Sequence, residues 1–272
     1  MTSLEFLYNT AFGRLLLKPL ASRGVSRACG SFLDTKFSKC FIKSFVKNNS
    51  IIEDDYILDD INSFNDFFCR RIKDGLRPVD MSAEVLAAPC DGLLTVYKID
   101  KDTVLPVKQS SYTIPDLLRD RELADKFNGG YCMVYRLCVD HYHRYGYAES
   151  GHKSKNVFIP GVLHTVRPVA LATRPVFVEN CREYCVIGSP DYGTIVQMEV
   201  GAMLVGRIVN DTKDEADVVR GTEKGHFEYG GSTIIVLLTA DRASIREDIL
   251  QASAEGNETP VRMGEKVARK EG

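Results

Sequence analysis

The clearest hydrophobic pattern in the chain covers residues 225–238. Apolar and polar residues alternate up to a diglycine pair that ends at Gly231, and after a Ser-Thr pair that begins at Ser232 an unbroken apolar run extends to Leu238. Alternation is typical of a half-buried strand, and a short continuous β-branched run is typical of a strand buried on both faces. The pattern therefore predicts two strands joined by a glycine bend.

Two segments near the N-terminus, residues 3–20 and 32–46, repeat apolar residues at roughly helical spacing among basic residues. Short basic amphipathic helices of this kind are expected to lie in a membrane interface and to face anionic lipid. The alternative is that their apolar faces pack on the rest of the protein. We assign residues 1–48 to a membrane-associating helical region and residues 49–272 to the main domain.

Short strands dominate the main domain from about residue 85 onward, because Gly, Pro and Asp turns interrupt the apolar runs. Helical patterns occur only at residues 114–127 and 244–253, and a helix start with Ser63 or Asn65 as its cap precedes a continuation through residues 70–73. The expected fold class is α+β and β-dominated, with a mostly antiparallel β body and N-terminal amphipathic helices. The expected strands are residues 93–97, 131–139, 157–160, 194–200 and 203–209.

Composition narrows the classes of function. The 272 residues carry a net charge of −2, which argues against a nucleic-acid-binding protein, although residues 1–48 hold eight basic residues against two acidic ones. The eight cysteines include no CxxC pair and are expected to be reduced thiols in a cytoplasmic protein. We expect neither a secretory signal nor a membrane-spanning run of roughly 20 apolar residues.

The Gly231-Ser232 bond is a candidate for chemistry on the chain itself. Glycine leaves the peptide carbonyl unobstructed and tolerates strained backbone angles, so the Ser232 hydroxyl could attack the preceding peptide bond. An N-to-O acyl shift followed by β-elimination would cut the chain and leave a dehydroalanine, which hydrolyses to a pyruvoyl group. The alternative is a simple hairpin turn in which Ser232 hydrogen-bonds its own backbone.

All the histidines fall between residues 141 and 226. His141 and His143 flank Tyr142 and would point to the same face of a strand, but a pair without a third ligand is weak evidence for zinc, and we expect no metal. A histidine that acts as a general base needs an orienting carboxylate, which Asp91 offers in an Asp-Gly turn.

The order and spacing of several short motifs resemble the phosphatidylserine decarboxylase family, in its bacterial branch with Gly-Gly-Ser-Thr, over nearly the whole chain. The motifs are Asn65-Asp66-Phe67-Phe68, Arg77-Pro78-Val79-Asp80, Pro89-Cys90-Asp91-Gly92, Tyr142-His143-Arg144, Pro160-Gly161-Val162-Leu163-His164-Thr165-Val166, Glu179-Asn180-Cys181-Arg182-Glu183, Val200-Gly201-Ala202 with Val205-Gly206, and Lys224-Gly225 with Phe227 before Gly231-Ser232-Thr233.

The resemblance implies a proenzyme that cuts itself between Gly231 and Ser232. The products would be a β chain of residues 1–231 and an α chain of residues 232–272 that begins with a pyruvoyl group derived from Ser232. Asp91, a histidine and Ser232 would form the processing triad. The pyruvoyl carbonyl would accept the electrons released with CO2 from phosphatidylserine, and the product would be phosphatidylethanolamine.

The resemblance does not settle which histidine is the base. Many family members carry a second histidine three positions after the first, whereas this chain has Gly146 there. His143 is our first choice, because Tyr142-His143-Arg144 matches the family motif, and His164 is the alternative.

The expected partners are phosphatidylserine, an anionic membrane surface and the chain's own α and β products as a heterodimer, with further pairing into a dimer of heterodimers left open. The expected location is peripheral, at the cytoplasmic face of the cell membrane. Three other functions stay open: a pyruvoyl-dependent decarboxylase of a soluble amino acid, a non-catalytic β domain docked on membranes, and a zinc hydrolase built on His141, His143 and His164.

Overall fold

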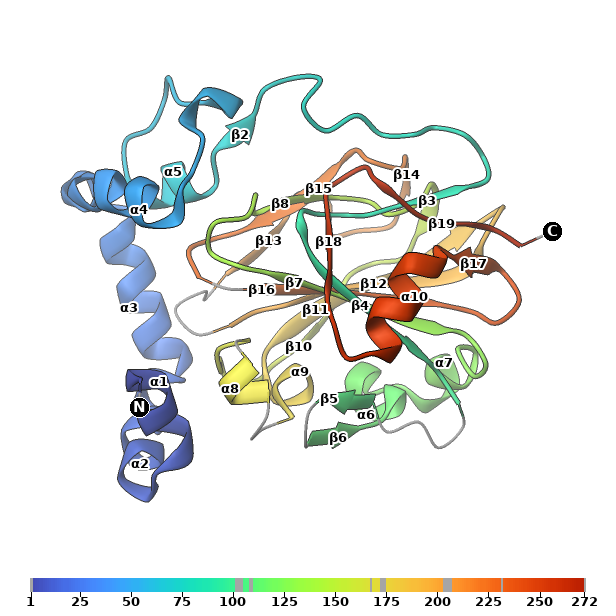
Figure 1. Ribbon diagram of the computed structural model, residues 1–272, viewed down its shortest axis with the longest axis horizontal. Helices are drawn as coiled ribbons and strands as arrows, with labels where there is room; N and C mark the ends of the chain where they lie inside the picture. The colour runs from blue at the N-terminus through green and yellow to red at the C-terminus, as the bar shows by residue number, and fades with distance from the viewer. Residues whose placement is uncertain are drawn as a thin grey trace.

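The computed structural model describes residues 2–100, 105–107, 110–166, 168–171, 175–202, 207–230 and 232–271. Its centre is a large antiparallel sheet with the strand order β14-β9-β11-β12-β16-β7-β4-β18, to which β10 is added beside β11 (Figure 1). The strands are β4 (Gly92–Lys98), β7 (Tyr131–Leu137), β9 (Gly151–Lys153), β10 (Val157–Ile159), β11 (Arg182–Ser189), β12 (Gly193–Val200), β14 (Ala216–Val218), β16 (Ser232–Leu238) and β18 (Thr259–Val261).

The predicted buried strand is β16, which lies between β12 and β7 and is buried along its whole length. Successive side chains of a strand point to opposite faces. Accordingly Ile234 and Val236 belong to one hydrophobic core, and Ile235 and Leu237 belong to a second core on the other face. Both faces of the strand are covered, which explains why its sequence is continuously apolar.

Small sheets cover the first of these faces. The alternating stretch before the diglycine pair forms β15 (Glu223–Phe227), between β13 (Ile208–Asn210) and β8 (Arg144–Gly146). A second small sheet contains β17 (Ala243–Ile245), β19 (Lys266–Lys270) and β3 (Val85–Ala87). Two-stranded pairs are β1 (Tyr56–Ile57) with β2 (Arg71–Ile72), and β5 (Leu105–Val107) with β6 (Ser110–Tyr112).

Short helices cover the other face (Figure 1). They are α6 (Ile114–Leu118), α7 (Arg121–Asp125), α8 (Pro168–Leu171) and α9 (Val176–Glu179). The expected helix over residues 114–127 is thus two helices, because Arg119 has a φ of 53° and ends α6 in the left-handed region. The helix α10 (Glu247–Ala254) matches its expectation and packs against β4.

Most expected strands are confirmed within one or two residues at each end. For the expected strand at residues 203–209, residues 203–206 lie outside the described residues, and β13 begins at Ile208. The described strands pair antiparallel, so the predicted α+β class with a mostly antiparallel body is confirmed.

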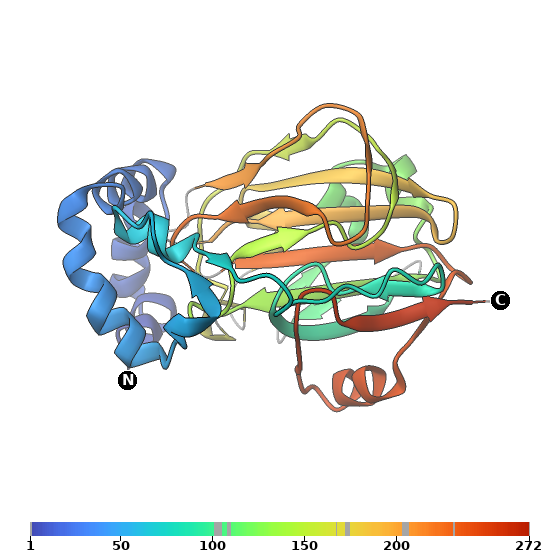
Figure 2. The same ribbon diagram turned by 90° about the horizontal axis from the view of Figure 1, so that it is seen from above.

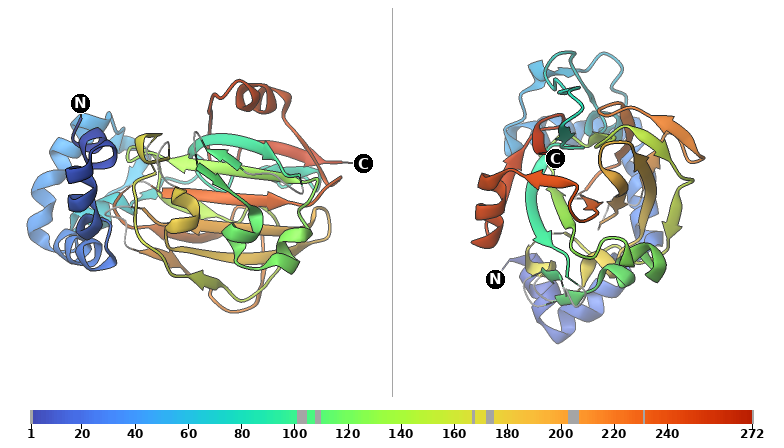
Figure 3. Two further views of the ribbon diagram at one scale, coloured as in Figure 1. Left: turned by 90° about the horizontal axis from the view of Figure 1, so that it is seen from below. Right: turned by 90° about the vertical axis from the view of Figure 1, so that its right-hand side faces the viewer.

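The N-terminal helices gather at one end of the β body, and the C-terminus lies at the opposite end (Figures 2 and 3). They are α1 (Ser3–Asn9), α2 (Ala11–Leu20), α3 (Arg23–Leu33), the 3-10 helix η1 (Lys36–Phe41) and α4 (Ile42–Asn49). The 3-10 helix η2 (Glu53–Asp55) and the helix α5 (Phe64–Phe68) follow them.

These helices differ from the expectation in three ways. The expected helix over residues 32–46 is divided, because α3 ends at Leu33, Lys36–Phe41 form the 3-10 helix η1, and α4 begins at Ile42. The expected helix over residues 3–20 breaks at Thr10, which is extended and accepts a hydrogen bond from the Gly13 N–H at 2.9 Å, so that it starts a new helix. The helix α3 was not expected, because Gly24, Ser26 and Gly30 weaken its apolar periodicity.

The apolar side chains of the N-terminal helices divide into two sets. Tyr8 and Leu17 are 2% exposed and belong to the same core as Ile159 and Val166 of the main domain. A second set points to solvent, namely Phe12, Leu15, Leu16, Leu20, Phe32, Phe37 and Phe41. The helices therefore both pack on the domain and leave an apolar surface uncovered. Within the described ranges, none of the helices reaches the length and hydrophobicity of a membrane-spanning segment.

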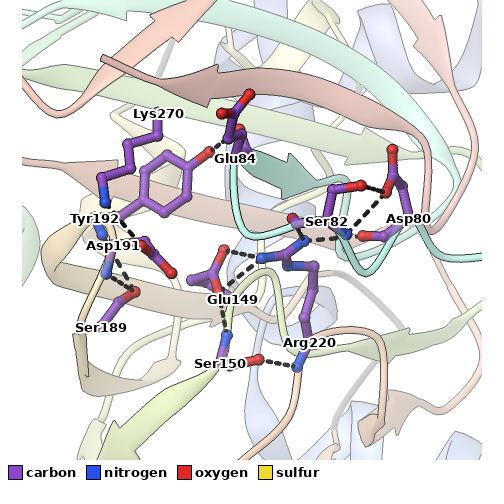
Figure 4. Close-up of polar contacts among 10 residues, drawn as sticks. All are labelled: Asp80, Ser82, Glu84, Glu149, Ser150, Ser189, Asp191, Tyr192, Arg220 and Lys270. Atoms are coloured by element: carbon purple, nitrogen blue, oxygen red, sulfur yellow. Dashed lines mark hydrogen bonds and ion pairs between the residues drawn. The ribbon is translucent and has the colours of Figure 1, made fainter. Parts of the chain in front are cut away.

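A long connection from β2 to β3 crosses the body and is fixed by Arg220 (Figure 4). The Arg220 Nη1 donates to the carbonyl oxygens of Asp80 and Ser82 at 2.9 and 2.7 Å, and Nη2 donates to Glu149 at 3.1 Å. Both charged side chains are buried, and pairing Arg220 with Glu149 lowers the cost of burying the two charges. This anchor holds the segment that carries Arg77 against the body.

Candidate active site

Ser232 is the first residue of β16 and is fully buried opposite Leu137 of β7. Its Oγ has no hydrogen-bond partner among the described residues. A hairpin-turn serine is expected to hydrogen-bond nearby backbone, and Ser232 makes no such bond to a described residue. Gly230 has a φ of 129°, a conformation that favours glycine, whereas Gly231 lies outside the described residues.

His143 is the buried histidine whose ring is set up to accept a proton. Its Nδ1 lies 2.9 Å from the carbonyl oxygen of His141, and since a carbonyl only accepts, Nδ1 carries the hydrogen. The buried Nε2 then presents a lone pair and has no hydrogen-bond partner among the described residues.

Burial lowers the pKa of His143 to about 3, and the nearby positive charge of Arg70 acts in the same direction. The backbone groups of His141 and Gly230 act in the opposite direction and raise the pKa. Gly230 precedes the expected cleavage site, so the backbone next to that site lies close to the His143 ring. The imidazole is therefore neutral near pH 7, the state a general base requires.

Aromatic rings enclose this region. The ring centroids of Phe68 and His143 are 4.1 Å apart, and those of Phe68 and Tyr229 are 5.2 Å apart. Phe45 of α4 and Phe64 of α5 also contact Tyr229 edge to face. The N-terminal helices thus form one wall around the segment that leads to Ser232.

Asp91 does not make the hydrogen bond to His143 that the expected triad requires. Its carboxylate binds Arg77 through two hydrogen bonds of 2.8 and 2.5 Å and accepts the Met263 N–H at 2.9 Å. Its negative charge acts instead on His141, where it partly opposes the lowering of the pKa by burial. Asp91 thus acts on His141 through its charge, and the carbonyl oxygen of His141 in turn accepts from His143 Nδ1.

His164 lies near the same end of the sheet but has a different environment. Its Nδ1 is 3.2 Å from the Tyr8 hydroxyl of α1, and its Nε2 is 3.3 Å from a carboxylate oxygen of Glu179. Asn180 holds its backbone and also donates to the carbonyl oxygen of Gly201 at 2.7 Å. The two ring nitrogens of His164 thus face Tyr8 of α1 and Glu179 of α9.

The structure does not bring His141, His143 and His164 together as a zinc site. Groups of three close ligand atoms in the described part of the chain are Cys138 with Asp140 and His141, and Asp211 with Glu223 and His226. Arg136 contacts the Cys138 sulfur at 3.1 Å in the first group, and Arg71 and Arg144 pair with Glu223 in the second. Neither group contains His143 or His164.

Two features near the site were not expected from the sequence. Arg70 is buried beside the aromatic wall, although the sequence does not distinguish it from its exposed neighbour Arg71. An apolar groove of about 670 Å³ runs between the N-terminal helices and Tyr229. Its walls include Phe32, Leu33, Phe41, Phe45, Phe64 and Tyr229. In the sequence, the amphipathic pattern of residues 32–46 is the feature from which this apolar groove could have been predicted.

Comparisons with known proteins agree with the resemblance drawn from the motifs. A family model described as phosphatidylserine decarboxylase matches residues 64–269. A protein of Clostridium acetobutylicum named phosphatidylserine decarboxylase proenzyme 2 is 40% identical over 97% of this chain and 90% of its own length. Proteins named phosphatidylserine decarboxylase proenzyme from Clostridium kluyveri and Clostridium botulinum are 37% and 36% identical over 98% of this chain and 92% of their own lengths. The chain belongs to the phosphatidylserine decarboxylase family.

Proposed function

We infer that this protein is a self-processing decarboxylase that converts phosphatidylserine to phosphatidylethanolamine and CO2 by means of a pyruvoyl group derived from Ser232. The observation that carries the proposal is the buried Ser232 hydroxyl, which has no hydrogen-bond partner among the described residues. The neutral His143 lies in the same enclosed region, and its Nε2 also has no hydrogen-bond partner among the described residues. Other buried hydroxyls, such as Thr233 Oγ1, also have no partner among the described residues. What points to chemistry is therefore the combination of such a hydroxyl with a neutral histidine beside a Gly-Ser bond.

In the proposed self-cleavage, His143 Nε2 takes the Ser232 hydroxyl proton while Oγ attacks the carbonyl carbon of Gly231. The peptide C–N bond breaks as the amide nitrogen is protonated, and an ester remains. Loss of the Ser232 Cα proton then breaks the Cβ–Oγ bond, which frees the Gly231 carboxylate and leaves dehydroalanine. Water converts that residue to a pyruvoyl group and releases ammonia.

His143 is preferred to His164 as the base because the ring nitrogens of His164 face Tyr8 and Glu179. We propose that Asp91 acts indirectly. Its negative charge raises the pKa of His141, and the carbonyl oxygen of His141 accepts the hydrogen bond that orients the His143 ring. This modifies the expected triad, in which Asp91 contacts the base directly.

The site is suited to a pyruvoyl group at position 232. When formed, that group supplies an electron-accepting carbonyl at which the substrate amine is held while CO2 leaves. Phe68 and Tyr229 provide an apolar wall that excludes water, and low polarity disfavours a carboxylate relative to neutral CO2. The carbon that lost CO2 then takes up a proton, which we propose reaches it from solvent through His143.

The apolar groove supports a lipid substrate over a soluble amino acid. It borders Tyr229 and is long enough to contact several phenylalanines, whereas a free amino acid has no aliphatic chain to fill it. We propose that the acyl chains enter this groove while the exposed apolar residues of α2, α3 and η1 dip into an anionic membrane surface at its cytoplasmic face.

The two products of cleavage are proposed to stay together as a heterodimer. The α chain would begin with β16, which is hydrogen-bonded to β12 on one side and to β7 on the other. Separation would therefore expose the centre of both hydrophobic cores.

The proposal is tested by CO2 release from carboxyl-labelled phosphatidylserine in mixed micelles. The purified protein should release labelled CO2, and the Ser232→Ala variant should release none. A metal chelator should have no effect, which separates this function from the zinc hydrolase. Release from free serine but not from the lipid would favour the soluble-substrate alternative, and release from neither would leave the non-catalytic alternative.

A further inference from the structure

Arg70 is a buried cation whose charge is not balanced by any described carboxylate. The residue is 2% exposed, and its Nη1 donates to the carbonyl oxygen of Phe67 at 3.2 Å. Its Nε and Nη2 are buried and have no hydrogen-bond partner among the described residues. Burying an unpaired guanidinium is costly, so an acceptor is expected at these two nitrogens when the protein works.

Aromatic rings fix the direction of this guanidinium. Its central carbon lies 4.1 Å from the ring centroid of Tyr56 and 4.9 Å from that of Phe67. Stacking on ring faces leaves the edge of the guanidinium free for planar hydrogen bonding, the geometry that suits phosphate and carboxylate oxygens.

A pocket of about 350 Å³ opens beside Arg70. Four carboxylates line it. Three are bound elsewhere: Asp34 accepts from the Asn65 side chain at 2.7 Å, Asp66 accepts from the Asn62 N–H at 2.9 Å, and Glu228 lies 3.3 Å from Arg207. The fourth, Asp60, is exposed to solvent, which screens its charge. Arg144, which also lines the pocket, is paired with Glu223. The pocket therefore offers an incoming anion one unpaired cation, Arg70.

The position of Arg70 relates this pocket to the candidate active site. The carbonyl oxygen of Phe68 lies 3.5 Å from Arg70 Nη1, and the ring of Phe68 packs on His143. The pocket also adjoins the apolar groove, since Leu33 and Phe64 line the groove while the next residues, Asp34 and Asn65, line the pocket. An apolar groove, a buried cation and the catalytic histidine thus lie next to one another.

We propose that Arg70 binds the phosphodiester of the lipid substrate through Nε and Nη2, with the acyl chains in the apolar groove. The inference rests on the proposed function. The phosphodiester fits better than the serine carboxylate, because an ion pair with the carboxylate would stabilise the ground state and oppose its loss as CO2. The phosphodiester keeps its charge throughout the reaction.

The first test compares steady-state kinetics on a short-chain phosphatidylserine for Arg70→Met, Arg70→Lys and the control Arg269→Met. Arg269 is an exposed arginine of β19 and lines neither the Arg70 pocket nor the apolar groove. We expect Arg70→Met to raise KM about tenfold or more with kcat changed much less, because a charge-assisted bidentate contact is lost from the bound substrate. Arg70→Lys should restore part of the affinity, and Arg269→Met should match the unmodified protein.

A second pocket is the alternative binding site for the phosphodiester. Lys155, Arg207 and Lys213 line a cavity of about 370 Å³ near Gly201. If Lys213→Met raises KM and Arg70→Met does not, the phosphodiester lies in that cavity and the proposal for Arg70 is wrong. An unchanged KM in both Arg70 variants would also overturn it. If Arg70→Met does not fold, Arg70→Lys decides, with a KM raised several-fold expected.

A binding measurement separates this inference from the proposed function. The uncleaved Ser232→Ala protein should bind short-chain phosphatidylserine in calorimetry, and adding Arg70→Met should weaken that binding about tenfold. Absence of CO2 release with this difference present would defeat the decarboxylase proposal alone. CO2 release with equal binding by both proteins would defeat the inference alone.

Discussion

His143 combines two properties at the scale of a single residue: it is fully buried, and its pKa is lowered to about 3 from an ordinary value of 6.5. The folded state therefore binds the proton less readily than the unfolded chain. The stability linked to this histidine is complete above pH 6.5 and declines as the pH falls from 6.5 toward 3.

This linkage can be measured by urea unfolding of the uncleaved Ser232→Ala protein between pH 7 and pH 4. The free energy of unfolding should decrease on acidification, with His143 contributing up to about 1.4 kcal/mol per pH unit in this range. The added substitution His143→Gln should make the dependence shallower. Equal slopes for the two proteins would mean that His143 is not held neutral by burial.

The choice between the two histidines is also a question for single residues. His143→Gln should leave a folded, uncut chain, because it removes the unpartnered base, whereas His164→Gln should still be cut. Denaturing gel electrophoresis over a time course of expression reports both, and circular dichroism checks the fold. Cleavage in His143→Gln together with its loss in His164→Gln would reverse the assignment.

At the scale of elements, β16 determines the stability of the body, since its side chains serve both cores. Ile235→Ala in the Ser232→Ala background should lower the free energy of unfolding by about 2–5 kcal/mol, because Ile235 is completely buried and its truncation leaves a cavity. Val157→Ala, at an exposed position of β10, should change it by less than about 0.5 kcal/mol. A similar small loss for Ile235→Ala in urea unfolding would contradict the central position of β16.

The elements that could be predicted were those with strong local signals. The apolar run of β16 specified a buried strand, and Ser63, one of the two expected caps, caps α5 by accepting the Asp66 N–H at 3.0 Å. The expected continuation through residues 70–73 is wrong, since α5 ends at Phe68 and Arg71–Ile72 form β2. The break at Thr10 and the end of α6 at Arg119 were missed, because both residues also occur inside helices. Their roles depend on tertiary packing that local propensity does not encode.

The site was less predictable, because its geometry depends on which partners compete for each polar group. Asp91 and His143 were both identified from their motifs. However, the carboxylate of Asp91 is bound by Arg77, and the His143 ring is held by a neighbouring carbonyl. A sequence shows that these groups exist, but not that a guanidinium is the stronger partner for Asp91. Arg70 was missed for the same reason, since burial is a property of the assembled fold.

At the scale of the whole molecule, the N-terminal helices both complete the core and carry an exposed apolar surface. Deleting them would remove Tyr8 and Leu17 from the core, so point substitutions are the better test of membrane binding. Phe12 and Phe37 are 62% and 85% exposed, and replacing both with Ser should reduce binding to anionic vesicles several-fold while self-cleavage continues.

The control for this experiment replaces Met81 and Val219, two exposed apolar residues of the main domain, with Ser. Sedimentation with vesicles of phosphatidylcholine, with and without phosphatidylglycerol, measures the bound fraction. The control should bind as the unmodified protein does, and added salt should weaken binding. Equal binding by the Phe12 and Phe37 double variant would place the membrane contact elsewhere.

The central claim is that the chain converts its own Ser232 into a pyruvoyl group, and the mass of the purified, denatured protein tests it most directly. The account predicts two fragments, residues 1–231 and residues 232–272, with the second lighter than its serine-ended form by the mass of one ammonia. The Ser232→Ala protein should give one intact mass. An intact mass for the unmodified protein, or a second fragment that begins with unaltered serine, would contradict the account.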